Sequence, residues 1–96
     1  MFKHRKIRAG KKYIDAVWVK LQNKNFILLR GGRGFVMCGY LNLKAAEKFK
    51  DAAAKITGAS TLREALKATV HSATGPAKKL GIYKGQPVKD ALKIIA

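Results

Sequence analysis

Apolar and polar residues alternate in the first part of the chain with the period of two that is typical of β-strands. Between residues 13 and 21 both faces of the expected strand are apolar: Tyr13, Val17, Val19 and Leu21 form one face, and Ile14, Ala16 and Trp18 form the other. Such a strand is expected to be covered on both sides. Shorter apolar runs at 26–30 and 35–41 follow after polar or glycine-rich breaks. The pattern predicts an antiparallel meander.

Beyond residue 41 the apolar residues recur every three or four positions, which is the period of a helix. Asn42 is a suitable cap for the first of these helices. Its apolar stripe consists of Leu43, Ala46, Phe49, Ala53 and Ile56. The segment 56–59 lies between two expected helices and is a candidate for a brief buried strand.

Local signals mark the later helices more sharply. Thr61 and Glu64 have the spacing of a capping box, in which a hydroxyl and a carboxylate satisfy free amides at a helix start. Thr74 caps a short helix at 75–80, and Gly81 supplies its left-handed stop. A final amphipathic helix follows it.

We therefore predict a single α+β domain over residues 1–96. It consists of an N-terminal antiparallel β meander followed by three helices with one or two short strands, so that 1–41 is mostly strand and 42–96 mostly helix. A chain of 96 residues is long enough for one compact core and too short for two.

The charge of the chain bears on its function and not on its fold. The chain has 21 Lys and Arg against 5 Asp and Glu, a net charge of +16, and such an excess attracts polyanions such as nucleic acid. The N-terminal cations belong to either a basic arm or a short edge strand. The candidate polyanion-binding residues are Lys3, Arg5, Lys6, Arg8, Lys11, Lys12, Arg30 and Arg33. The alternative is a host with Lys-rich proteins, in which the charge serves solubility.

The segment 30–34 combines two arginines with three glycines. It resembles one unit of an RNA-binding Arg-Gly repeat, and its amides offer a cradle for a phosphate. A hairpin turn that needs positive φ is the simpler explanation of the glycines.

Cys38 is the strongest candidate for a catalytic residue. It lies beside Gly39, a few residues before an expected helix start, where the positive end of the helix dipole activates a thiol. His71 is the candidate base, provided that the fold brings it to Cys38. The alternative for Cys38 is a small buried residue on a core strand.

Hydroxyl groups stand at two expected helix starts, Ser60 with Thr61 and Thr74. Free amides there can bind an anion, although capping alone explains these residues. Non-enzymatic polyanion binding is thus our first hypothesis. The second is a small enzyme or ligand-binding protein with a pocket near Cys38 and these helix starts.

Five aromatic residues lie on the expected strands: Tyr13, Trp18, Phe26, Phe35 and Tyr40. They could form a platform on which nucleic-acid bases stack. Burial in a core or in a subunit interface is the alternative.

Several short motifs run through the chain in one order. They are the alternating strand at 16–21, Asn25 with Phe26, the segment 34–41 around Met37, Cys38 and Gly39, Thr61 with Leu62, Leu80 to Ile82 followed by Gly85, and Ala91 with Leu92. With these motifs the chain resembles the small YunC-like proteins of bacteria and archaea, whose biochemical role is uncharacterised. The resemblance implies a β-rich half used in tetramer formation, a helical half, and no assigned substrate or catalytic residue.

Other classes of function find no support in the sequence. One cysteine and five scattered acids give no pattern for a metal, and no cofactor motif is present. No apolar run reaches the roughly 18 residues that cross a bilayer. We expect a cytoplasmic protein without a membrane partner. A homo-oligomer, dimer or tetramer, would cover the second face of the N-terminal sheet.

Overall fold

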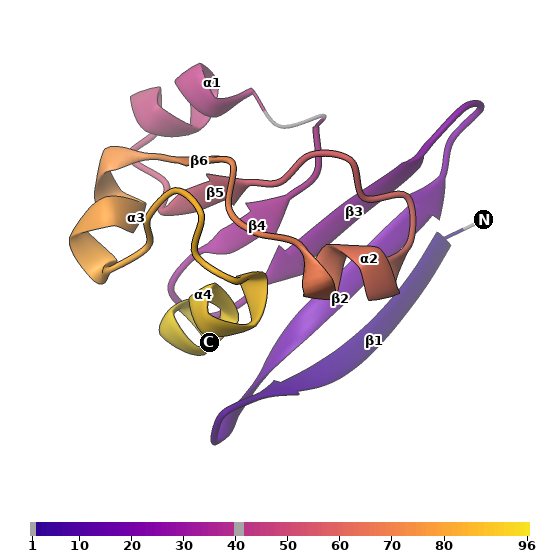
Figure 1. Ribbon diagram of the computed structural model, residues 1–96, viewed down its shortest axis with the longest axis horizontal. Helices are drawn as coiled ribbons and strands as arrows, with labels where there is room; N and C mark the ends of the chain where they lie inside the picture. Colours follow the sequence, from indigo (N-terminus) through magenta and orange to yellow (C-terminus); the bar gives the residue numbers. More distant parts are fainter. Residues whose placement is uncertain (1, 40–41) are drawn as a thin grey trace.

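Within the described part of the chain, six strands form one sheet in the order of the sequence, from β1 to β6 (Figure 1). The computed structural model describes residues 2–39 and 42–96. The strands are β1 (Phe2–Ala9), β2 (Lys12–Lys20), β3 (Asn25–Arg30), β4 (Phe35–Met37), β5 (Ala53–Lys55) and β6 (Ser72–Ala73). β1 to β4 pair antiparallel, β5 is parallel to β4, and β6 is antiparallel to β5. The α+β class with its N-terminal meander is confirmed.

The basic N-terminal segment is a long edge strand and not a free arm. β1 pairs with β2 along its whole length, from Phe2 opposite Val19 to Ala9 opposite Lys12. Gly10 makes the turn between them with φ of +66°, a conformation that favours glycine. The cations of this segment are therefore held at fixed positions on the sheet.

Four helices follow among the described residues: α1 (Leu43–Lys48), α2 (Leu62–Lys67), α3 (Gly75–Leu80) and α4 (Val88–Ile95). They lie at the four segments that carry helix signals, although the overall prediction counted three helices. The caps predicted at Asn42, Thr61 and Thr74 are confirmed, since each side chain accepts a hydrogen bond from an amide of the first turn. Gly81 ends α3 with φ of 108°. No helix within 2–39 and 42–96 is both long and apolar enough to cross a membrane.

The expected first helix is shorter than its apolar stripe suggested. α1 ends at Lys48, and Lys50 takes a left-handed conformation with φ of 61°. The amide of Asp51 then bonds to the carbonyl of Ala46 and closes the helix. The prediction of a brief strand at 56–59 is wrong: the strand is β5 at Ala53–Lys55, and residues 56–59 are not in a strand. A short buried strand and a helix are not distinguishable from apolar spacing alone.

The two faces of the sheet are covered unequally (Figure 1). Ile14, Ala16, Ile27, Leu29 and Val36 are buried in the main core, to which α2, α3 and α4 contribute their apolar side chains. On the opposite face α1 packs only over β4 and β5, through a smaller cluster around Ala46 and Ala53.

The prediction that β2 is covered on both sides is therefore wrong within this chain. Tyr13 on its outer face is 59% exposed. Val17 and Val19 on the same face are half-buried. The reason is that the described helices leave the outer face of β1, β2 and β3 open.

The glycine-rich turn between β3 and β4 also departs from expectation. Gly31 and Gly34 do not have positive φ. A Cβ at Gly31 would lie 2.2 Å from the carbonyl oxygen of Ile95, and a Cβ at Gly34 would lie 2.4 Å from that of Ala52. These two glycines are needed for close approach of neighbouring backbone. The amides of Gly31 and Arg33 already donate to carbonyls, which weakens the phosphate-cradle interpretation.

Candidate functional site

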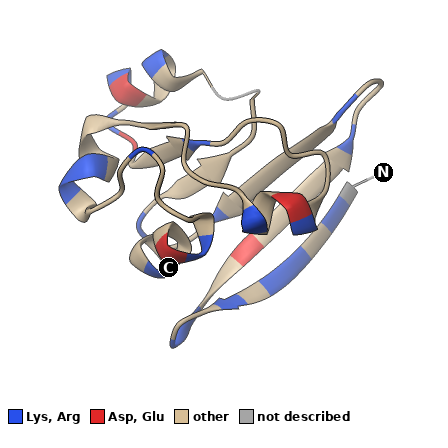
Figure 2. Ribbon diagram, in the orientation of Figure 1, with Lys and Arg blue, Asp and Glu red and all other residues tan. Residues whose placement is uncertain are grey.

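Lys and Arg recur along β1 (Figure 2), and the strand register divides them between the two faces of the sheet. Lys3 lies opposite Trp18 and Arg5 opposite Ala16, so both belong to the face that carries the helices. Lys6 and Arg8 belong to the outer face. The eight residues expected to bind a polyanion therefore do not form one patch.

The remaining candidates lie at the turns and on the outer face. Lys11 and Lys12 are at the β1–β2 turn, and Arg33 is in the β3–β4 turn. Arg30 is paired with Asp15 at 3.3 Å, and His4 contacts the same carboxylate at 2.9 Å. The hydrogen bond from His4, followed by that from Arg30, lowers the pKa of Asp15.

A groove between the sheet and α2 gathers cations that lie far apart in the sequence. The cavity measures about 520 Å³ and is lined by Arg5, Trp18, Thr61, Leu62, Arg63, Leu66, Lys67 and Lys89. Its cations come from β1, α2 and α4, and none of the described residues that line it is acidic. Trp18, Leu62 and Leu66 are partly buried against the main core and supply its apolar wall.

The local sequence of α2 explains this arrangement. Thr61 fixes the helix start by accepting the amide of Glu64 at 3.1 Å. Leu62 and Leu66, four residues apart, then face the core, and Arg63 and Lys67 follow them along the rim. Glu64, the one acid of α2, is occupied at the cap because Ser60 donates to it through both its hydroxyl and its amide.

Of the groove cations, only Arg5 was among the residues expected from the sequence. Arg63, Lys67 and Lys89 have the pattern of solvated helix charges, and nothing local to them indicates a groove. One feature of the sequence could have indicated the groove: Arg63 and Lys67 each directly follow a leucine, Leu62 and Leu66, on the apolar side of the helix.

The described candidates for the aromatic platform do not all lie on one face of the sheet. Trp18 shares the helix-covered face with Ala16, whereas Tyr13, Phe26 and Phe35 belong to the outer face by strand register. Phe35 packs against the cluster under α1. Tyr40 and Leu41 lie outside the described residues. Trp18 is the aromatic residue that remains available to the groove.

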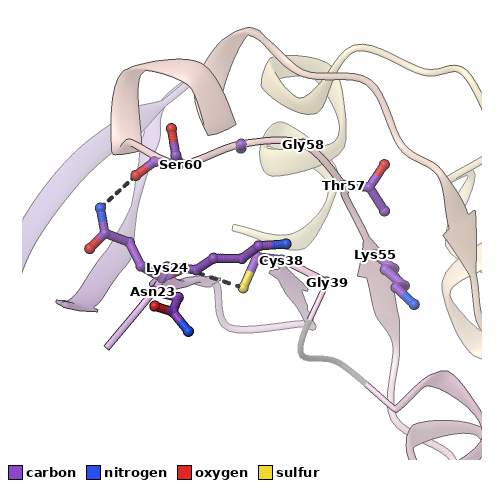
Figure 3. Close-up of a pocket in the computed structure, with 10 residues that line it drawn as sticks. Asn23, Lys24, Cys38, Gly39, Lys55, Thr57, Gly58 and Ser60 are labelled. Atoms are coloured by element: carbon purple, nitrogen blue, oxygen red, sulfur yellow. Dashed lines mark hydrogen bonds between the residues drawn. The ribbon is translucent and has the colours of Figure 1, made fainter. Parts of the chain in front are cut away.

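A second cavity, of about 650 Å³, lies beside Cys38 at the opposite end of β4 from the glycine-rich turn (Figure 3). We call it the Cys38 cleft, and it is lined by Asn23, Lys24, Asn25, Cys38, Gly39, Lys55, Thr57, Gly58, Ala59 and Ser60. Cys38 is 4% exposed. Its sulfur accepts the amide of Ile27 at 3.4 Å, and its thiol donates to the carbonyl of Asn25 at 4.0 Å.

The other residues expected near Cys38 are placed differently. His71 is exposed, and its Nδ1 lies 3.1 Å from the Ser72 hydroxyl. Its amide donates to Lys55 of β5, the strand between β4 and β6. Thr74 is fully buried and bridges Ala53, Ala77 and Asp51.

Only Ser60 of the two expected helix starts reaches the Cys38 cleft. Thr61 and Thr74 act as caps, as the alternative interpretation held. Within the described ranges no three His, Cys, Asp or Glu side chains are grouped so that they could hold a metal.

Comparison with known proteins identifies related chains. The sequence profile of a family described as a domain of unknown function, DUF1805, matches residues 37–95. The uncharacterized protein YunC of Bacillus subtilis (strain 168) is 36% identical over 81 residues, which is 80% of each chain. The crystal structure of a protein of unknown function, TA1206 from Thermoplasma acidophilum, has a TM-score of 0.95 at 30% identity and covers 100% of this chain and 94% of its own.

Proposed function

Because the chain belongs to the DUF1805 family of YunC-like proteins, whose descriptions name no activity, we propose a function from its own groove. The protein is a non-enzymatic binder of single-stranded nucleic acid. One observation carries this proposal: Arg5, Arg63, Lys67 and Lys89 line one groove together with Trp18, and none of the described lining residues is acidic.

The groove offers both parts that a single strand requires. Guanidinium and ammonium groups on its rim attract the phosphates, and the release of counterions makes that attraction strongest at low salt. The indole of Trp18 can stack on an unpaired base of any sequence. Lysines outnumber arginines in the chain, which favours backbone contact over base readout.

A single strand fits better than a duplex because of where Trp18 lies. The indole is partly buried between β2 and α2, so a base has to enter the groove to reach it. Bases in a duplex are already stacked and paired, and extracting one costs a few kcal/mol. Duplex DNA would contact the rim cations alone.

The test compares two double variants that remove equal charge. Arg63→Gln with Lys67→Gln changes the groove, whereas Lys78→Gln with Lys79→Gln changes the exposed side of α3. Binding of a labelled single strand of about 12 nucleotides is followed by fluorescence anisotropy. We expect the α2 variant to bind on the order of tenfold more weakly than wild type and the α3 variant to change by less than about threefold.

Two results would contradict the proposal. Equal losses in both double variants would mean that only net charge matters. Undetectable affinity for single- and double-stranded nucleic acid at about 50 mM salt would remove polyanion binding altogether.

We also propose that the protein is a homo-oligomer in the cytoplasm. The open outer face of β1, β2 and β3 supports the first part, because Tyr13, Val17 and Val19 leave an apolar strip accessible there. The free thiol of Cys38 supports the second, since a reducing compartment keeps a thiol reduced.

A further inference from the structure

We propose that the Cys38 cleft is a second binding site, independent of the groove, and that it holds the phosphate group of a compact small molecule. Its volume of about 650 Å³ falls within the range of small-molecule sites. None of the described residues that line it is aromatic or acidic. The cleft therefore suits an anion.

Two lysines from separate segments supply the charge. Lys24 lies in the loop between β2 and β3, and Lys55 lies on β5. Figure 3 shows Lys24 extended across the cleft in front of Cys38, with Lys55 on the other side. The ion pairs of the described residues are those that Asp15 makes with His4 and Arg30, so neither lysine has a carboxylate partner there.

Of the two lysines, Lys55 is the stronger indication of an anion site, because it is half-buried. A half-buried lysine has already lost part of its conformational freedom, so an anion that binds there orders it at a smaller cost in entropy. Lys24 is exposed, so it can approach an anion held against Lys55.

Neutral donors complete the lining. Asn23 contributes an amide, and Thr57 and Ser60 contribute hydroxyls, all suited to phosphate oxygens. Gly58 has φ of +77° and open space around its Cα. Within the described part of the chain, no group accepts a hydrogen bond from the amides of residues 57–59.

The two walls of the cleft are joined before any ligand binds. The side-chain amide of Asn25 donates to the carbonyl of Ser60 at 2.5 Å, which ties the start of β3 to the segment before α2 (Figure 3). Cys38 forms part of the floor as a small neutral side chain whose thiol already has partners. Binding therefore requires little rearrangement and no reaction at sulfur.

Amide chemical shifts of ¹⁵N-labelled protein provide the test. The protein is titrated with inorganic phosphate and with glycerol phosphate at about 150 mM salt, which screens weak surface binding. We expect saturable shifts at Gly39, Gly58 and Ser60. Lys55→Gln and Lys24→Gln should each weaken binding by about tenfold, whereas Lys79→Gln on α3 should change it by less than about twofold.

The groove variant with Arg63→Gln and Lys67→Gln separates this site from the nucleic-acid site. We expect it to bind phosphate as wild type does. Shifts that do not saturate, shifts centred on Trp18 and Arg63, or equal effects of Lys55→Gln and Lys79→Gln would each overturn the proposal. Because Lys24 is exposed, Lys24→Gln keeps the test valid even if Lys55→Gln impairs folding.

Discussion

Single glycines in the β3–β4 turn have different structural requirements. Gly31 faces the carbonyl of Ile95 too closely for a side chain, whereas Gly32 has no atom within 4 Å of an added Cβ. We expect Gly31→Ala to lower the free energy of unfolding by about 1–3 kcal/mol through overpacking. Gly32→Ala should stay within about 0.5 kcal/mol of wild type. Urea unfolding measures both, and equal values would show that the turn tolerates a side chain at either position.

Cys38 shows how burial decides between a reactive and a structural thiol. It is 4% exposed, and its sulfur accepts the amide of Ile27. We expect iodoacetamide to alkylate it at least about tenfold more slowly in the folded protein than in urea, because reaction needs an exposed thiolate. Similar rates in both states, measured between neutral and alkaline pH, would restore Cys38 as a candidate nucleophile.

The residues of the sites differ in how far sequence could reveal them. Cys38 and Ser60 were predictable, because a lone thiol and a hydroxyl at a helix start are recognisable locally. Arg63, Lys67 and Lys89 were not, because a helical cation lies in a groove only if another element supplies the opposite wall. Here that wall includes Arg5 of β1 and Trp18 of β2, some 45 to 60 positions before the α2 cations along the sequence.

At the scale of elements, helix starts were predictable and one strand was not. Asn42, Thr61 and Thr74 mark helix starts through contacts within three residues, so local sequence suffices. β5 owes its existence to pairing with β4 and β6, which are distant in sequence. Its run of alanines fits a helix equally well, and only the sheet decides.

The cap of α2 makes the stability of the fold depend on pH. The hydroxyl of Ser60, and next its amide, lower the pKa of Glu64 from its ordinary value of 4.5. A carboxylate with a lowered pKa stabilises the fold above its unfolded pKa, and that contribution is lost as the pH falls through the folded value. We expect the melting temperature to fall between roughly pH 5 and pH 3 more steeply in wild type than in Glu64→Gln. If the melting temperatures of the two proteins, measured by circular dichroism, fall equally with pH, the charge of Glu64 at the cap contributes nothing to stability.

For the whole molecule, the net positive charge opposes association of two copies, whereas the apolar strip on the open sheet face favours it. The outer face carries Lys6 and Arg8 beside its apolar strip, together with Arg30, which is paired with Asp15, so the net charge there is positive and two copies repel one another. Salt screens this repulsion and leaves apolar burial intact. We expect the mass measured by light scattering to rise toward a dimer or tetramer as salt increases. A monomeric mass at every salt concentration, at micromolar protein, would remove the homo-oligomer.

The overall architecture followed from sequence patterns because alternation and helix caps are local signals. The asymmetry of the sheet did not, since the apolar outer face of β2 looks the same whether a helix or a second copy covers it. The two cavities likewise depend on how α2 and the segment before it cross the sheet.

The most direct test of nucleic-acid binding uses the single tryptophan, Trp18, as a reporter of the groove. An oligodeoxythymidylate of about 12 nucleotides is added while the emission of Trp18 is recorded. We expect saturable quenching at about 50 mM salt that weakens progressively toward about 200 mM. Unchanged emission while the oligonucleotide is bound would place binding outside the groove, and unchanged emission without binding would contradict the proposed function itself.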